Sequence, residues 1–270
     1  MVHVTVIDEL KRAKIAALLE RGERIDGRRL DEPRKLTIET NAIPKAEGSA
    51  RVHLGRTDVV TGVKVQPDRP FPDVGDRGIF ICTAEILPLA HPDVETGPPS
   101  PAVIELARVV DRGIRESGMV DLSKLVLLKD KSVIGIFADS SVIDVDGNLF
   151  DACSYAATAA ILTAKLPKWE IQDEAPVRIE GETPVPVTTI PVSVTMAKIN
   201  GHILVDPNQD EWAVMDARIT ITTNSDGNIC ALQKGGNSGF THAELVKCGE
   251  ISVRVGADIR EIIKRAGGGS

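Results

Sequence analysis

The grouping of strand-like runs around a few long helical segments most constrains how this chain can fold. The first half holds β-branched runs, separated by turn residues, at 36–40, 50–54, 59–65, 79–86, 125–128 and 133–145. Helical patterns accompany them at 100–118 and 151–166, the second almost uniformly Ala, Ile and Leu and ended by Pro167. The second half holds strand-like runs at 192–199, 202–205, 217–223 and 228–233, followed by a helix from 241 to 263. Such runs predict antiparallel strands of a shared sheet in each half.

Turn chemistry suggests that the two halves repeat one plan. Each half carries an Asp-Gly-Asn hairpin, at 146–148 and 226–228, before its last long helix. This arrangement indicates an internal duplication. Between the halves, residues 167–191 contain five prolines and alternate polar with apolar positions, which predicts a domain junction that runs into an edge strand. A further helix is expected over 6–21.

Composition excludes several classes of protein. With 270 residues, two domains are the natural expectation. No apolar run approaches the roughly 20 residues that span a bilayer, and the start of the sequence lacks an export pattern, so we expect a cytoplasmic protein without a membrane partner. The four cysteines, Cys82, Cys153, Cys230 and Cys248, have no metal-ligand spacing and are predicted to be buried apolar residues. The net charge of −7 and 3% aromatic content restrict any RNA contact to a local basic patch that follows the backbone.

An acidic segment after a predicted strand, 205–212, is the best candidate for chemistry. Asp206, Asp210 and Glu211 lie here, followed by Trp212. One carboxylate holds a catalytic Mg²⁺ poorly, because the ion usually needs more than one anchoring acid together with substrate phosphate. From the residues alone, a metal site and a strand end with solvated loop charges both remain open. The histidines have no ligand spacing, and the segment 144–148 lacks the downstream glutamate of a calcium loop.

Four segments together resemble the RNase PH family over about residues 20 to 258: Arg24 to Arg28, Glu105 to Glu116, Leu204 to Pro207, and Thr222 to Ile229. The closest similarity is to the family's non-catalytic subunit in the archaeal exosome. The resemblance implies an α+β, RNase PH-like fold of two ribosomal-protein-S5-domain-2-like βαββα units. It places an N-terminal helix and arm at 1–30, domain 1 at 31–170 and domain 2 at 171–270. It also implies heterodimers that build a six-membered ring around an RNA channel and degrade RNA from its 3′ end with inorganic phosphate.

Three parts of the family's active site are missing from this sequence. Active members carry an Arg-Arg pair after the serine that opens a helix, where this chain has Ser100-Pro101-Ala102. Their Asp-Gly-Gly-Thr-Arg loop, which cradles phosphate, is Asp146 to Phe150 here. Their second aspartate, six positions after the first, is Trp212. We therefore expect no catalytic residue, metal or cofactor in this chain. The alternative is that the chain is itself an Mg-dependent phosphorolytic 3′-to-5′ exoribonuclease that uses Asp206, Asp210 and Glu211.

A stripe of arginines is the candidate RNA-binding surface. Arg108, Arg112 and Arg115 fall at i, i+4 and i+7 of the predicted helix 100–118, which also carries Glu105, Asp111 and Glu116. Surface ion pairing explains this pattern equally well by itself. The family resemblance favours RNA contacts by Arg112 and Arg115, with Arg108 a weaker candidate. The expected partners are a catalytic homologue in a heterodimer and hexameric ring, RNA-binding cap proteins and single-stranded RNA. A third hypothesis is an RNA-binding adaptor without a ring partner.

Overall fold

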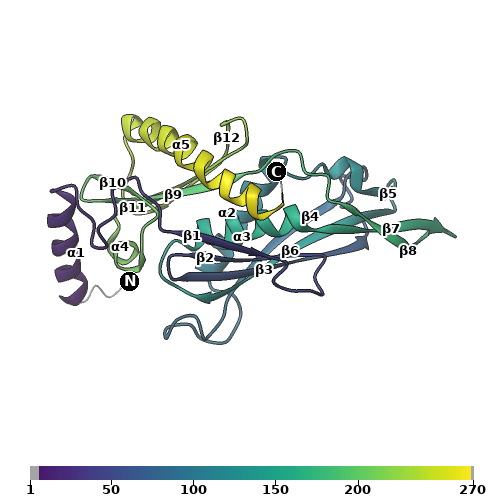
Figure 1. Ribbon diagram of the computed structural model, residues 1–270, viewed down its shortest axis with the longest axis horizontal. Helices are drawn as coiled ribbons and strands as arrows, with labels where there is room; N and C mark the ends of the chain where they lie inside the picture. The colour runs from purple at the N-terminus through teal and green to yellow at the C-terminus, as the bar shows by residue number, and fades with distance from the viewer. Residues whose placement is uncertain (1–5, 269–270) are drawn as a thin grey trace.

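The larger of two main sheets forms the base of the molecule in the computed structural model, which describes residues 6–268 (Figure 1). Its strand order is β1-β2-β3-β6-β4, with β5 beside β6, and only β4 and β6 run parallel. The strands are β1 (Leu36–Thr40), β2 (Gly48–Leu54), β3 (Thr57–Asp68), β4 (Ile79–Ile86), β5 (Val126–Leu128) and β6 (Ser132–Asp144). A short 3₁₀ turn, η1 (Leu122–Leu125), precedes β5. This mixed sheet confirms the α+β class.

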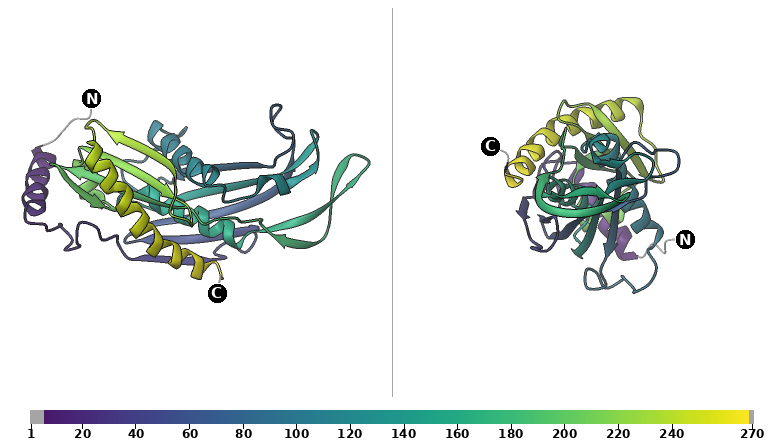
Figure 2. Two further views of the ribbon diagram at one scale, coloured as in Figure 1. Left: turned by 90° about the horizontal axis from the view of Figure 1, so that it is seen from above. Right: turned by 90° about the vertical axis from the view of Figure 1, so that its right-hand side faces the viewer.

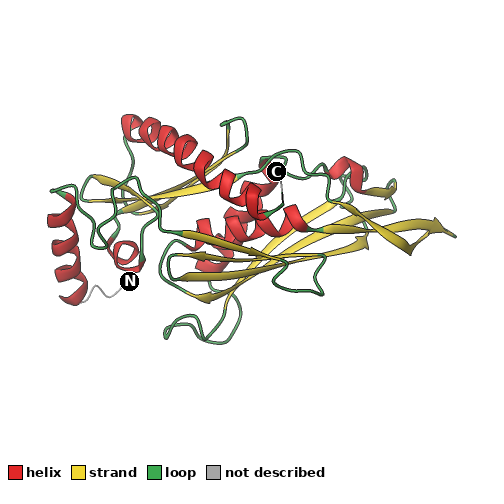
Figure 3. Cartoon of the chain, viewed as in Figure 1, coloured by secondary structure: helices red, strands yellow, loops and turns green. Residues whose placement is uncertain are grey.

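Two helices cover one face of the larger sheet (Figure 3). Helix α2 (Pro101–Glu116) begins at Ser100, whose hydroxyl accepts a hydrogen bond from the Val103 N–H, with proline in the first turn as predicted. Helix α3 (Leu149–Thr163) packs on β2 and β3 and also on β9 of the second sheet. Because α3 lies between two sheets, nearly its whole surface is buried, which explains its apolar composition. At Gly48 any Cβ would lie 2.4 Å from the Ala160 carbonyl oxygen, so this strand and helix meet backbone to backbone.

The smaller sheet has four antiparallel strands in the order β10-β9-β11-β12. They are β9 (Val192–Ile199), β10 (His202–Val205), β11 (Ala217–Thr223) and β12 (Ile229–Gly236), with a short helix α4 (Gln209–Val214) between β10 and β11. The long helix α5 (His242–Ala266) packs across β9 and β11, and the predicted Thr241–Glu244 capping box opens it. We call residues 36–163 the first unit and residues 192–266 the second. Their apolar side chains form one continuous core.

Two further elements lie at opposite ends of the molecule (Figure 2). Helix α1 (Val6–Leu19) packs against α4, and its Ile15 and Leu19 join a small second core with Ala197 and Leu204. At the other end, β7 (Lys165–Gln172) and β8 (Ala175–Pro184) form a two-stranded ribbon that projects from the body. No helix within residues 6–268 is long and apolar enough to cross a membrane.

The structure departs from the sequence predictions in several places. Residues 167–191 do connect the two units, as expected of a junction, but most of them form the separate β7–β8 ribbon. A two-residue turn at Asp173 and Glu174, both with positive φ, closes this ribbon. A ribbon with open edges tolerates prolines, because their missing N–H groups face solvent. The segment 146–148 is not a hairpin but a strand-to-helix turn, in which Asn148 caps α3, so its equivalence to 226–228 fails. Cys230 is only half-buried, whereas the other three cysteines are buried as predicted.

Candidate functional site

The carboxylate at the end of β10 is buried between the two units and satisfied by neighbouring donors. Asp206 is 1% exposed. It accepts hydrogen bonds from the backbone N–H, Nε and Nη2 of Arg34 at 2.8, 2.9 and 2.8 Å. The side-chain amide of Asn148 donates another at 2.7 Å. Arg28 Nη1 adds a longer contact of 3.4 Å. Five donors, including a bidentate guanidinium, therefore neutralise and orient this carboxylate.

A second buried acid completes a polar chain across the interface. The Asn148 amide donates both to Asp206 and, at 2.8 Å, to Asp151, which also accepts from the Thr195 N–H at 2.9 Å. Burial would raise the pKa of Asp206, but Arg34 outweighs it, so this pKa lies below its usual range. Burial raises the pKa of Asp151 to about 7, although hydrogen bonds from Asn148 and Thr195 oppose the shift. The two acids thus belong to one hydrogen-bond network at the interface, in which the pKa of Asp206 is lowered and the pKa of Asp151 is raised.

The glutamate in the acidic segment is a structural residue of the N-terminal arm. Glu211 is fully buried and pairs with both Nε and Nη2 of Arg24 at 2.8 and 2.6 Å. It also forms a capping box with Asn208 at the start of α4. Arg24 donates in addition to the carbonyl oxygens of Val205 and Asp206 at 2.8 and 3.0 Å. This bidentate pair fastens the segment after α1 onto the second unit.

These acids do not form a site for Mg²⁺. Asp210 is half-buried and pairs with Lys11 at 2.8 Å, on the side of α4 that faces α1. Both carboxylates already accept from arginines: Asp206 from Arg34 and Arg28, and Glu211 from Arg24. Across residues 6–268, no group of three His, Cys, Asp or Glu side chains is arranged to hold a metal ion. The donor set does not fit the ion, because magnesium needs carboxylate oxygens that are open to it and to its waters.

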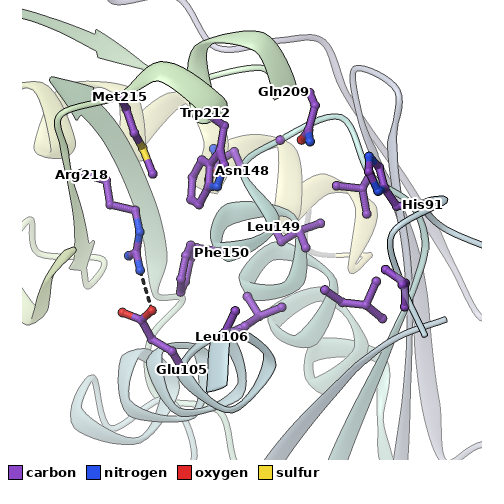
Figure 4. A pocket seen from close by; sticks show the side chains of 15 residues that line it. His91, Glu105, Leu106, Asn148, Leu149, Phe150, Gln209, Trp212, Met215 and Arg218 are labelled. Atoms are coloured by element: carbon purple, nitrogen blue, oxygen red, sulfur yellow. Dashed lines mark ion pairs between the residues drawn. The ribbon is translucent and has the colours of Figure 1, made fainter. Parts of the chain in front are cut away.

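An aromatic stack lies beside this network (Figure 4). Trp212 lies over Phe150 with ring centroids 6.0 Å apart, and the guanidinium of Arg218 sits 4.2 Å from the Phe150 centroid. Arg218 pairs with Glu105 of α2 at 2.7 Å and presses against the backbone of Gly235, where a Cβ would lie 2.5 Å from its Cζ. The adjoining cavity, of about 380 Å³, has mainly apolar walls that include Ile86, Leu106, Val145, Leu149 and Met215. Of the Arg218 guanidinium that lines this cavity, Nη2 pairs with Glu105, whereas Nη1 is buried and has no hydrogen-bond partner among the described residues.

Comparison with known proteins shows which family this chain belongs to. The models for domain 1 and domain 2 of the 3′ exoribonuclease family, RNase PH, match residues 32–167 and 189–255. The chain belongs to the RNase PH family. It is 46% identical to "Exosome complex component Rrp42" of Thermococcus gammatolerans over 99% of both chains. A chain of the Archaeoglobus fulgidus exosome with RNA bound to the active site is 45% identical, with a TM-score of 0.88 over 95% of this chain and 99% of that one. A chain described as archaeal exosome core gives 42%, a TM-score of 0.85, and coverage of 96% and 98%.

The three candidate RNA-binding arginines lie together on α2 of this RNase PH fold. All three side chains are exposed. Arg115 is paired with Asp111 at 2.8 Å and donates to the Phe80 carbonyl oxygen at 2.9 Å. Arg112 donates to the neutral side chain of Gln233 at 2.6 Å. The ion pairing considered from the sequence is therefore real for Arg115, whereas Glu105 turns away from the stripe toward Arg218.

Sequence reasoning missed the arginines that hold the acids. Arg24 lies in the segment that carried the resemblance to the RNase PH family, but it was not assigned a role. Arg34 and Arg218 carry no local signal, because their partners Asp206 and Glu105 lie more than a hundred residues away. Pairs of a buried arginine and a distant carboxylate can be recognised only once the fold is known.

Proposed function

We propose that this chain is a non-catalytic ring subunit of an exosome that degrades RNA from its 3′ end by phosphorolysis. In this role it holds RNA for a catalytic RNase PH homologue and completes that partner's active site. The observation that carries the proposal is that arginines neutralise both buried acids of the segment 205–212, where an active site would need them free. The relatives named exosome components support the assignment to the complex.

Phosphorolysis makes chemical demands that these residues do not meet. Attack by inorganic phosphate needs arginine forks or free backbone N–H groups around a dianion, together with a metal that stabilises the transferring phosphoryl group. Ser100 and Pro101 only cap α2. The N-terminus of α3 is occupied by its own cap Asn148 and covered by Leu149 and Phe150. Each missing stabiliser costs roughly a hundredfold or more in rate, so activity of the chain by itself is not expected.

The α2 arginines supply what the chain contributes instead. A stripe of exposed guanidinium groups can follow successive phosphates of a single strand. The side-chain partner of Arg112 is the neutral Gln233, so no carboxylate offsets the arginine's charge at this contact. Arg108 is exposed on the same helix, and no hydrogen-bond or ion-pair partner is seen for it among the described residues. We propose that Arg112 and Arg115 make the main phosphate contacts, with Arg108 as a supporting contact.

The partners follow from the ring. We propose a one-to-one heterodimer with a catalytic homologue, three of which close a hexamer, with RNA-binding cap proteins on the ring and a cytoplasmic location. Copurification with the homologue tests the assembly. A monomeric chain that binds RNA without that homologue would favour the adaptor hypothesis instead.

The salt dependence of RNA binding tests the RNA-holding role. We expect the ring assembled with Arg112→Ala and Arg115→Ala to bind RNA with a log–log salt slope smaller by about 1.4, since each single-strand phosphate contact contributes about 0.7. The matched control is Arg21→Ala, which removes an exposed arginine whose ion pair with Glu23 lies at the end of α1. A slope that stays at the wild-type value in the double variant would contradict the proposal.

A further inference from the structure

A line of polar contacts connects Arg218, beside the aromatic stack, to the candidate RNA-binding arginines of α2. Arg218 of β11 pairs with Glu105 Oε2 on α2 at 2.7 Å. Glu105 Oε1 accepts a hydrogen bond of 3.2 Å from Gln233 Nε2 on β12. Gln233 Oε1 in turn accepts one of 2.6 Å from Arg112 Nη2. Three elements of the two units are thereby joined through four side chains.

This line fixes which way the Gln233 amide faces. Its NH₂ group lies beside the Glu105 carboxylate and 3.4 Å from the Lys234 carbonyl oxygen, and both of these accept but cannot donate. Glu105 is paired with Arg218, which is 6% exposed and packed between Phe150 and Gly235. A flipped amide would set its oxygen against two acceptors. Its oxygen therefore points at Arg112.

The neutral side chain of Gln233 is a suitable partner for Arg112, because Arg112 must remain free to bind an anion. A carboxylate at position 233 would neutralise Arg112, as Asp111 does for Arg115. The neutral oxygen of Gln233 uses one N–H of the Arg112 guanidinium and leaves its charge and its other donors for a phosphate. A long exposed side chain that is already held in place loses less conformational freedom when it binds.

We propose that Gln233 is a positioning residue that preorganises Arg112 for an RNA phosphate, and that the Arg218–Glu105 pair serves as its anchor. This inference rests on the proposed RNA-holding function of α2. It assigns a role to Arg218, which packs against the aromatic stack of Phe150 and Trp212.

A double-mutant cycle on the assembled ring tests the inference. Gln233→Met keeps the length of the side chain but removes its hydrogen bonds with Arg112, Glu105 and the Lys234 carbonyl oxygen. We expect it to weaken RNA binding about 2- to 10-fold in the wild-type background, which corresponds to the cost of ordering one long side chain. In the Arg112→Ala background the same substitution should have no effect on binding. Gln172→Met, an exposed change on the projecting ribbon, is the matched control.

The outcomes separate this inference from the proposed function. If Arg112→Ala weakens RNA binding but Gln233→Met does not, or weakens it equally with and without Arg112, the positioning role is overturned and the RNA-holding role stands. If Arg112→Ala itself leaves binding unchanged, the RNA-holding role of Arg112 fails, and this inference fails with it. Thermal melting of each ring shows whether a loss of affinity reflects unfolding, which a positioning role would not cause.

Discussion

Replacing Asp206 with asparagine tests whether the carboxylate of this residue has a structural or a catalytic role. Asp206→Asn preserves the shape of the side chain but removes the charge that pairs with the two guanidinium donors of Arg34. It also turns an NH₂ group toward donors, because every contact that Asp206 makes with Arg34 and Asn148 is as an acceptor. Breaking a buried ion pair by removing one partner costs about 3 to 5 kcal/mol. At about 2 to 4 °C per kcal/mol for a chain of this size, we expect the melting temperature to fall by roughly 10 °C.

Thermal unfolding of the isolated chain, followed by tryptophan fluorescence with and without Mg²⁺, measures this effect. The matched control is Asp210→Asn, which removes an exposed ion pair that contributes about 1 kcal/mol or less. Wild-type melting should be the same with and without the ion, since a bound ligand would raise it. The reasoning is refuted if Asp206→Asn melts like the wild type while the assembled ring loses phosphorolysis, or if Mg²⁺ stabilises the wild type and not this variant.

Three other substitutions test separate parts of the account. Gly235→Ala should destabilise the chain by about 1 to 3 kcal/mol in denaturant unfolding, because its Cβ would lie 2.5 Å from the Cζ of Arg218. The control Gly97→Ala, whose Cβ would face open space, should have little effect. Equal stabilities of the two variants would contradict the packing described. The pKa of Asp151 is about 7 in the fold and about 3.9 when unfolded, so the stability it contributes is complete below about pH 4 and is lost as the pH rises through 7. Asp151→Asn should therefore flatten the decline in unfolding free energy between about pH 4 and pH 7, and a wild-type slope in the variant would disprove this. Trp212→Asp restores one acid but no phosphate cradle, so the variant should release no nucleoside diphosphates from RNA; detectable product would show that one carboxylate is enough.

Local patterns predicted most of the helices and strands, because burial on one face or on all faces leaves a periodic signal. Helix α3 was evident as an apolar run, and the strands of both sheets as β-branched runs. The β7–β8 ribbon was missed because its prolines resemble a linker until the pairing of the two strands is known. Helix α4 was missed because it spans only six residues, and its capping box resembled an acidic loop.

The site was predictable only in part. The sequence singled out Asp206 and the tryptophan six positions later, where active members of the family carry a second aspartate, as the candidate site. It did not reveal that Arg34, distant by 172 residues, neutralises Asp206, or that Arg24 does the same for Glu211 across 187 residues. Contacts at such separations depend on how the two units pack, and no local spacing encodes that. For the same reason Gln233 was not recognised as a neighbour of Arg112.

The most direct test of the central claim is an activity assay on the chain alone and on the ring assembled with a catalytic RNase PH homologue. Each sample is incubated with 3′-tailed RNA, inorganic phosphate and Mg²⁺, and nucleoside diphosphates are quantified. The account predicts no product from the isolated chain and steady release from the ring. Nucleoside diphosphates produced by the isolated chain would contradict it.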